Sequence, residues 1–191
     1  MSFKILVVCI GNVCRSAQAE RLLEFRLGRL LGPRRDEVSV SSAGVRAMVG
    51  YPMDASSERE LTRLGATAEG FESTQLTASA VAQADLVLTA TKDLRSRVLQ
   101  ESPGALKRTF TLLEFAALTD GSTPSSPKDL VAGAADRRSS AQLDDYDIAD
   151  PIDASDRVHA QVAAVIDQAT RTITAAIATS VVEPVEPVSG S

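Results

Sequence analysis

The sequence predicts an α/β fold in which a parallel sheet is covered by helices on both faces. Short apolar, β-branched runs alternate along the chain with longer stretches whose apolar residues recur every three or four positions. The connections between them are mostly short, and no internal repeat is present. Hydrophobic residues make up 44% and charged residues 24% of the 191 residues, which is the ordinary balance of a globular chain.

Four short runs are expected to form the strands of this sheet. They are rich in apolar and β-branched residues, as strands covered on both faces usually are. The runs cover residues 3–8, 38–42, 85–90 and 108–113.

Between the strands, the apolar residues take up helical spacing. The first helix is expected to end at Leu31, because the pattern that includes Ala19 stops there and Gly32-Pro33 follows. Further helices are expected over residues 56–64, 92–100 and 156–179.

A single domain is expected over residues 1–179. One segment inside it and one after it lack the alternation of predicted strands and helices. Residues 119–147 are rich in Ser, Asp, Gly and Pro and show little periodicity, so we expect a flexible surface insertion rather than a folded subdomain. Residues 180–191 contain the sequence VVEPVEPVSGS, whose proline spacing does not suit a helix, so we expect a disordered tail.

Composition and charge exclude several classes of protein. No apolar run approaches the roughly 20 residues that cross a bilayer, and the first residues lack the ordered regions of a signal peptide. The net charge is −5, and no basic stripe is present for a nucleic-acid backbone to follow. We therefore expect a cytoplasmic protein without membrane insertion and without a nucleic-acid partner.

The chain has two cysteines, Cys9 and Cys14, and one histidine, His159. Two cysteines cannot build a disulfide framework, and so few potential ligands argue against a zinc site. A lone cysteine is most often a small buried apolar residue. Position argues otherwise for Cys9, which lies where the first predicted strand leads into the first predicted helix.

The segment from Cys9 to Ser16 has the composition of an anion-binding loop. It lies at the carboxyl end of a predicted parallel strand, where open α/β sheets bind ligands, and several of its N–H groups have no helical partner. Gly11 and Asn12 tolerate positive φ, so that consecutive amides can converge on one point. With the planar guanidinium of Arg15 beside it, such a ring of amides suits phosphate or a similar oxyanion.

The same surroundings favour the thiolate of Cys9 over the thiol, because amide dipoles and a guanidinium stabilise a negative sulfur. Ser16 can donate a hydrogen bond to that sulfur. One short segment therefore offers an oxyanion cradle and a nucleophile, which predicts attack on phosphorus through a phosphocysteine intermediate.

The sequence CIGNVCRS, residues 9–16, resembles the signature of the low-molecular-weight protein tyrosine phosphatases, in which a cysteine and an arginine flank five residues and a serine follows. The resemblance extends to Ser42-Ala43-Gly44, residues 85–89 and Asp150-Pro151. It implies a four-stranded parallel sheet flanked by helices on both faces, which is a flavodoxin-like three-layer sandwich. It also implies hydrolysis of phosphotyrosine in a protein substrate, without a metal or a cofactor.

Carried over by position, the resemblance implies that Cys9 is the nucleophile and that Arg15 clamps the phosphate. The implied phosphate-binding loop comprises Ile10, Gly11, Asn12, Val13, Cys14 and Arg15. Asn12 is expected to hold the loop in shape through a hydrogen bond with Ser42, and Ser16 is expected to stabilise the thiolate. Cys14 either packs as a small apolar residue or protects Cys9 from irreversible oxidation through a reversible disulfide.

The general acid is expected to be Asp150, because the resemblance includes an Asp-Pro loop that closes over the site. Pro151 keeps the aspartate out of helical geometry. The carboxyl group would protonate the leaving oxygen and then activate the water that attacks the phosphocysteine. Three further aspartates, Asp147, Asp153 and Asp156, lie nearby without this match.

The residues expected around the substrate depart from the family pattern. Many relatives carry an aromatic pair near residues 46–49 and a tyrosine after the Asp-Pro, where this chain has Met48 and Ile152. These two residues and Tyr51 are expected either to line an apolar slot or to pack within their own loops. The segment around Met48 resembles that of bacterial phosphatases that are paired with tyrosine kinases of capsule and exopolysaccharide export. This resemblance implies a kinase partner. We expect a monomer or a weak dimer.

Two other classes of function stay open at this point. An arsenate reductase shares this fold and cysteine loop, but its usual thiol relay needs further cysteines, and the chain has none after Cys14. A reductase that uses an external thiol is compatible with the sequence. A non-catalytic module that binds an oxyanion or phosphotyrosine is the third reading, although binding alone requires neither Cys9 nor Asp150.

Overall fold

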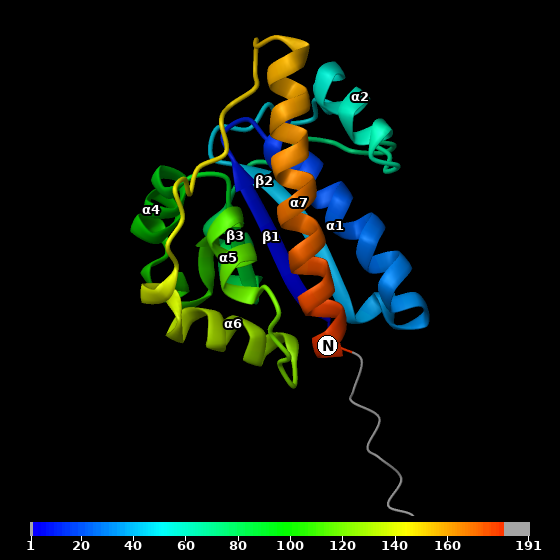
Figure 1. Ribbon diagram of the computed structural model, residues 1–191. Helices are drawn as coiled ribbons and strands as arrows, with labels where there is room; N and C mark the ends of the chain where they lie inside the picture. Colours follow the sequence, from blue (N-terminus) through cyan, green and yellow to red (C-terminus); the bar gives the residue numbers. More distant parts are fainter. Residues whose placement is uncertain (1, 182–191) are drawn as a thin grey trace, which may run out of the picture.

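The computed structural model describes residues 2–181 and contains a parallel four-stranded sheet with the strand order β2-β1-β3-β4 (Figure 1). The strands are β1 (Phe3–Cys9), β2 (Val38–Gly44), β3 (Leu86–Thr89) and β4 (Thr109–Thr111). Each of the four lies within or close to a predicted run. The α/β class and the parallel sheet are therefore confirmed.

Helices occupy most of the remaining chain. The α-helices are α1 (Arg15–Leu31), α2 (Ala55–Arg63), α3 (Ala78–Gln83), α4 (Lys92–Glu101), α5 (Leu112–Thr119), α6 (Pro127–Asp136) and α7 (Asp156–Val181). Three short 3₁₀ helices are η1 (Gly32–Glu37), η2 (Pro103–Arg108) and η3 (Arg138–Ser140).

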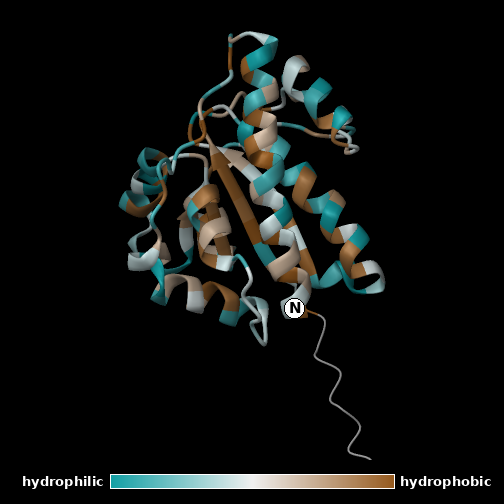
Figure 2. Ribbon diagram, viewed as in Figure 1, coloured by the Kyte–Doolittle hydropathy of each residue, from teal (hydrophilic) through white to brown (hydrophobic). Residues whose placement is uncertain are grey.

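The central strand β1 faces two different hydrophobic clusters because successive side chains of a strand point to opposite faces. Ile5 and Val7 pack in the larger cluster, which includes residues of α1, α5, α6 and α7. Leu6 and Val8 pack in a smaller cluster with residues of α3 and α4. Figure 2 shows the strands as mainly hydrophobic and the helices as mixed. The sheet is therefore the middle of three layers, as the resemblance implied.

Helix α1 follows the loop after β1 and carries its apolar residues on the side that faces the sheet. The fully buried side chains include Leu22, Leu23 and Leu27, each of which contributes roughly 1.5–3 kcal/mol by leaving water. Helix α7 packs against α1, α2 and α5. The last helix thus covers the helix that begins at the phosphate-binding loop.

The fourth predicted strand is shorter than expected. It ends at Thr111, because this residue caps the N-terminus of α5. The Thr111 hydroxyl accepts the N–H of Glu114 at 3.1 Å, and the Glu114 carboxylate accepts the N–H of Thr111 at 3.2 Å. Such a capping box starts a helix, and Leu112 and Leu113 therefore belong to α5 and not to the strand.

The expectation that residues 119–147 lack regular structure is wrong for their middle part. Residues 127–136 form α6, whose start is capped by the Ser126 hydroxyl and has proline at its first position. Leu130, Val131 and Ala134 are buried and belong to the main hydrophobic cluster. This spacing is one turn of an apolar helix face, a signal that the polar residues around it obscured.

The expectation of a disordered tail from residue 180 is wrong for its first two residues. Helix α7 continues to Val181, with Ser180 and Val181 both buried, so that these two residues belong to the fold. Residues 182–191 lie outside the described residues. Among residues 2–181, no helix is both long enough and apolar enough to cross a membrane.

Strand β2 comes very close to the loop after β1 at Gly44. This residue is paired with Cys9 in the sheet. A Cβ atom on Gly44 would lie 2.4 Å from the carbonyl oxygen of Ile10 and 3.0 Å from the backbone nitrogen of Asn12. Only glycine fits here without a shift of the loop.

We predict that Gly44→Ala lowers the free energy of unfolding by about 3 kcal/mol, because the added methyl group overlaps backbone that cannot move freely. Urea denaturation of wild type and variant measures this change. Gly104→Ala is the matched control, since no described atom lies within 4 Å of a Cβ at that position. Equal unfolding midpoints for the two variants would contradict the prediction.

Candidate active site

The candidate site lies at the carboxyl edge of the sheet, where β1 passes into α1. Cys9 is the last residue of β1 and is 2% exposed. Arg15 is the first residue of α1 and is 4% exposed. The residues between them form a loop that turns within a single short connection, as the sequence predicted.

The carbonyl groups of this loop point outward and are bonded to the segments around it. Each of four carbonyl oxygens accepts a backbone N–H at 2.9–3.1 Å. The pairs are Cys9 with Val45, Ile10 with Arg46, Gly11 with Met48, and Val13 with Asp54. In a trans peptide the C=O and the following N–H point to opposite sides. The N–H groups that follow these carbonyls therefore point away from the surrounding segments, toward the interior of the loop.

The sulfur of Cys9 accepts a hydrogen bond from one of these inward amides. The backbone N–H of Asn12 donates to Cys9 Sγ at 3.3 Å. Converging amides at the start of a helix form an anion-binding nest. The loop therefore places a nucleophilic atom at the base of a cradle that suits a tetrahedral oxyanion.

Asn12 holds the loop in this shape with its side chain. Its backbone has φ of 56°, in the left-handed region, and the residue is completely buried. The Nδ2 group donates to Ser16 Oγ at 2.8 Å and to Ser42 Oγ at 2.7 Å. The Oδ1 atom accepts the N–H of Thr74 at 2.7 Å. The expected hydrogen bond between Asn12 and Ser42 is thus present, and two more accompany it.

The hydroxyl of Ser16 lies 2.9 Å from Cys9 Sγ. Because Ser16 Oγ accepts a hydrogen bond from Asn12, its own hydrogen is free to point at the sulfur. Ser42 Oγ donates in turn to the carboxylate of Glu20. Burial raises the pKa of Glu20 above its usual value, and the bond from Ser42 acts in the opposite direction.

Arg15 joins the loop to the distant Asp-Pro segment. Its Nη1 donates to the carbonyl oxygen of Ile148 at 3.0 Å, and its Nη2 is ion-paired with Asp150. Its Nε is buried and has no hydrogen-bond partner among the described residues. A buried donor of this kind is costly unless a ligand accepts from it. The guanidinium is therefore available to bind an anion while it holds the Asp-Pro segment in place.

Asp150 is the aspartate that the structure brings to this site, and the three neighbouring aspartates lie elsewhere. Asp147 accepts the N–H of Lys92 at the start of α4. Asp153 sits in a left-handed turn, and Asp156 is paired with Arg59 on the surface. The second carboxylate oxygen of Asp150 accepts the N–H of Ile152 at 3.3 Å.

Cys14 is buried at the start of α1. Burial raises the pKa of its thiol to about 12, and a hydrogen bond with Ser57 offsets this only in part. A thiol with such a pKa is a weak nucleophile at neutral pH, which counts against rapid disulfide formation with Cys9. His159 is buried as well, with its Nδ1 3.3 Å from Ser57 Oγ, and it has no direct contact with Cys9 or Arg15.

The three residues expected to line the substrate pocket lie on segments next to the loop. The N–H of Met48 is bonded to the carbonyl of Gly11, and the N–H of Tyr51 is bonded to the carbonyl of Met48. Ile152 lies two residues after Asp150. Met48, Tyr51 and Ile152 are 43%, 58% and 44% exposed, so that part of each side chain is accessible to solvent.

Several residues that support the site were not identified from the sequence. Ser73 donates through its hydroxyl to the Gly11 carbonyl at 3.1 Å, beside the bond from Thr74 to Asn12. Both lie in a connection without periodicity, so that no sequence pattern marks them. Glu20 had a usable signal, because it follows Ser16 by one helical turn. Among residues 2–181, no group of three or more His, Cys, Asp or Glu side chains is arranged to hold a metal ion.

A buried thiol within a nest of amides, next to an arginine, defines the class of site in which a cysteine attacks a bound oxyanion. Comparison with known protein families supports this assignment of the site. The family described as low molecular weight phosphotyrosine protein phosphatase matches residues 4–123. The chain belongs to this family.

Relatives within the family are named for different activities. The chain is 36% identical over 113 residues to the low molecular weight protein-tyrosine-phosphatase Ptp of Acinetobacter johnsonii, covering 59% of this chain and 74% of that protein. It is also 36% identical over 121 residues to a protein-arginine-phosphatase of Geobacillus stearothermophilus, covering 63% of this chain and 76% of that protein.

A solved structure extends the likeness beyond the matched sequence region. The tyrosine phosphatase AmsI of Erwinia amylovora superimposes with a TM-score of 0.67 at 27% identity, covering 90% of this chain and 91% of that one. The family match ends at residue 123, before the Asp-Pro segment. The position of Asp150 is therefore supported by its ion pair with Arg15.

We predict that Asn12→Ala lowers the free energy of unfolding by about 3 kcal/mol, because it leaves buried polar groups without partners and keeps a Cβ in the left-handed region. Asn12→Gly loses the same hydrogen bonds but removes the backbone strain, so its loss is about 1 kcal/mol smaller. Urea denaturation measures both. Asn12→Ala as stable as wild type would show that the side chain does not hold the loop.

Proposed function

We propose that this chain hydrolyses phosphotyrosine in proteins through a phosphocysteine intermediate, with Cys9 as the nucleophile. The observation that carries the proposal is that Cys9 Sγ accepts the inward N–H of Asn12 in the same loop that leads to the buried guanidinium of Arg15. This arrangement stabilises a negative sulfur and a bound phosphate at the same point. Membership of the phosphatase family supports the same reaction.

Arg15 binds the phosphate of the substrate in the proposed reaction. Its Nη1 stays with the Ile148 carbonyl, while its Nε and Nη2 present two parallel donors to two phosphate oxygens. Nη2 is paired with Asp150 in this structure, so that phosphate binding releases the carboxyl group from the guanidinium. The carboxyl group is then free to reach the leaving oxygen.

In the first step, the sulfur of Cys9 forms a bond to phosphorus and the bond between phosphorus and the tyrosine oxygen breaks. The protonated carboxyl group of Asp150 gives its proton to that oxygen, which leaves as a neutral phenol. In the second step, Asp150 takes a proton from water as the water attacks phosphorus. The bond between sulfur and phosphorus then breaks, which releases phosphate and restores the thiolate.

The substrate side of the proposal is supported by the exposed apolar side chains beside the loop. Met48, Tyr51 and Ile152 offer apolar surface for an aromatic ring. We further infer a cytoplasmic location and a bacterial tyrosine kinase as the source of the phosphorylated protein. The resemblance of the segment around Met48 to phosphatases paired with such kinases supports this inference.

A direct assay distinguishes phosphotyrosine from other substrates of this type of site. The relative named as a protein-arginine-phosphatase is as similar to this chain as the tyrosine phosphatase is, at 36% identity each. An arsenate reductase would need an external thiol, because Cys14 is the last cysteine of the chain. Peptides carrying phosphotyrosine, phosphoserine or phosphoarginine, and arsenate with glutathione, are therefore compared in one series. We expect the highest kcat/KM for phosphotyrosine.

We predict that Cys9→Ser releases no phosphate from an aryl phosphate while its unfolding free energy stays close to that of wild type. Asp150→Asn is expected to slow turnover about 10²–10⁴-fold, the usual contribution of a proton-transfer group. Vanadate binding to Asp150→Asn shows whether the cradle is intact. Full activity of Cys9→Ser would refute the mechanism, and wild-type turnover of Asp150→Asn would assign the proton transfer to another group.

A further inference from the structure

The Asp-Pro segment is attached to the sheet just before it reaches Cys9. The N–H of Ile148 donates to the carbonyl of Ala90 at 2.9 Å, and the N–H of Ala90 donates to the carbonyl of Val8 at 2.9 Å. Val8 immediately precedes Cys9 in β1. The backbone of Ile148 therefore continues the row of hydrogen bonds that holds the nucleophile, and its own carbonyl accepts from Arg15.

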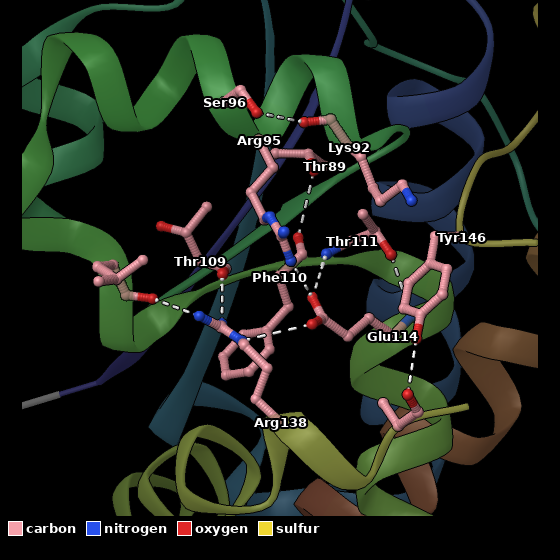
Figure 3. A network of polar contacts seen from close by, with 12 residues as sticks. Thr89, Lys92, Arg95, Ser96, Thr109, Phe110, Thr111, Glu114, Arg138 and Tyr146 are labelled. Atoms are coloured by element: carbon pink, nitrogen blue, oxygen red, sulfur yellow. Dashed lines mark hydrogen bonds and ion pairs between the residues drawn. The ribbon is translucent and has the colours of Figure 1, made fainter. Parts of the chain in front are cut away.

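Asp147, the residue before Ile148, attaches the same segment to α4. Its Oδ1 accepts the N–H of Lys92, the first residue of α4, at 2.7 Å. This N–H has no partner within the helix, and a carboxylate is favoured at the positive end of a helix. Nearby, the ammonium group of Lys92 lies 4.9 Å from the centre of the Tyr146 ring. Figure 3 shows these two side chains together beside the start of α4.

Helix α4 is a fixed support for this attachment. One turn after Lys92, Arg95 Nη1 donates to the carboxylate of Glu114 at 2.8 Å. Glu114 is buried on α5 and is also paired with Arg138 at 3.3 Å. Arg138 donates to the Thr109 carbonyl at 2.7 Å (Figure 3). Arg95 of α4 and Arg138, which lies in the segment that leads to Asp147, are thus joined through the buried carboxylate of Glu114.

We propose that Asp147 is a positioning residue for Asp150, which sets where the acid loop stands by attaching it to the N-terminus of α4. This inference rests on the proposed function. Two residues separate Asp147 from Asp150, and the first of them, Ile148, also holds the guanidinium of Arg15 through its carbonyl. Without the Asp147 carboxylate, this short segment loses a bond to α4 and keeps the backbone bond of Ile148 and the contacts with Arg15. The carboxyl group of Asp150 then samples more positions.

A misplaced acid affects substrates unequally. A poor leaving group such as the phenolate of phenyl phosphate needs protonation as the bond to phosphorus breaks, whereas 4-nitrophenolate leaves without much help. We expect Asp147→Ala to lower kcat/KM about tenfold for phenyl phosphate and less than twofold for 4-nitrophenyl phosphate. The constant kcat/KM is the relevant one, because it reports the step that forms the phosphocysteine.

Two variants serve as controls for this experiment. Asp144→Ala removes an exposed aspartate from the same segment, and no hydrogen bond or ion pair involves that side chain among the described residues. It should match wild type with both substrates. Asp147→Asn keeps an oxygen that accepts the Lys92 N–H but loses the charge, so it should recover part of the loss with phenyl phosphate.

A double-variant comparison tests whether Asp147 acts through Asp150. If it does, Asp147→Ala has no further effect once Asp150 is replaced by asparagine, and the double variant is as fast as Asp150→Asn alone. Multiplied losses in the double variant, or an equal loss with both substrates, would overturn the proposal. So would an Asp147→Ala enzyme that behaves like Asp144→Ala.

A wrong role for Asp147 and a wrong proposed function give different results. The Asp147 variants are compared with a wild-type enzyme that cleaves aryl phosphates, and Cys9→Ser must lack this activity. A wild type without this activity refutes the proposed function itself. Inhibition by vanadate, measured on each variant, should remain within about twofold of wild type, because the amides and Arg15 are unchanged.

Discussion

The site depends on the direction of the peptide groups between Cys9 and Arg15. Four carbonyls of this loop are bonded to neighbouring segments, and the opposite edges of those peptides must then face the sulfur. The left-handed backbone of Asn12 permits this turn, and its buried side chain joins the loop to Ser16, Ser42 and Thr74. In the proposed reaction, anion binding and the use of the Cys9 sulfur as nucleophile thus have one cause, which is the curvature imposed on a short stretch of backbone.

Arg15 connects this local arrangement with the rest of the molecule. Its guanidinium is almost fully buried and contacts both the Ile148 carbonyl and the Asp150 carboxylate. A buried cation is tolerated only when such partners offset its lost hydration. The same group is therefore structural in the ligand-free protein and, in the proposed reaction, the binding group for phosphate. This double use explains why the Asp-Pro segment lies beside the loop before any substrate is present.

The parts of the site that are local in sequence were predictable, because strand, loop and helix start all lie within about fifteen residues. Residues 9–16 were identified on that basis. The bond between Asn12 and Ser42 joins residues 30 positions apart and was expected only from the family resemblance. The contribution of Thr74 was not predictable, since it comes from an aperiodic connection and uses only backbone. Helix α6 was missed for a related reason, because its apolar face is one turn long and surrounded by serine and aspartate.

Chain order has a consequence for how a newly made molecule acquires its chemistry. Arg15 precedes its ion-pair partner Asp150 by 135 positions in the chain. Helix α7, which covers α1, comes later still. During translation the loop at residues 9–15 therefore emerges before Asp150, and the Arg15–Asp150 ion pair can form only once the intervening residues have left the ribosome.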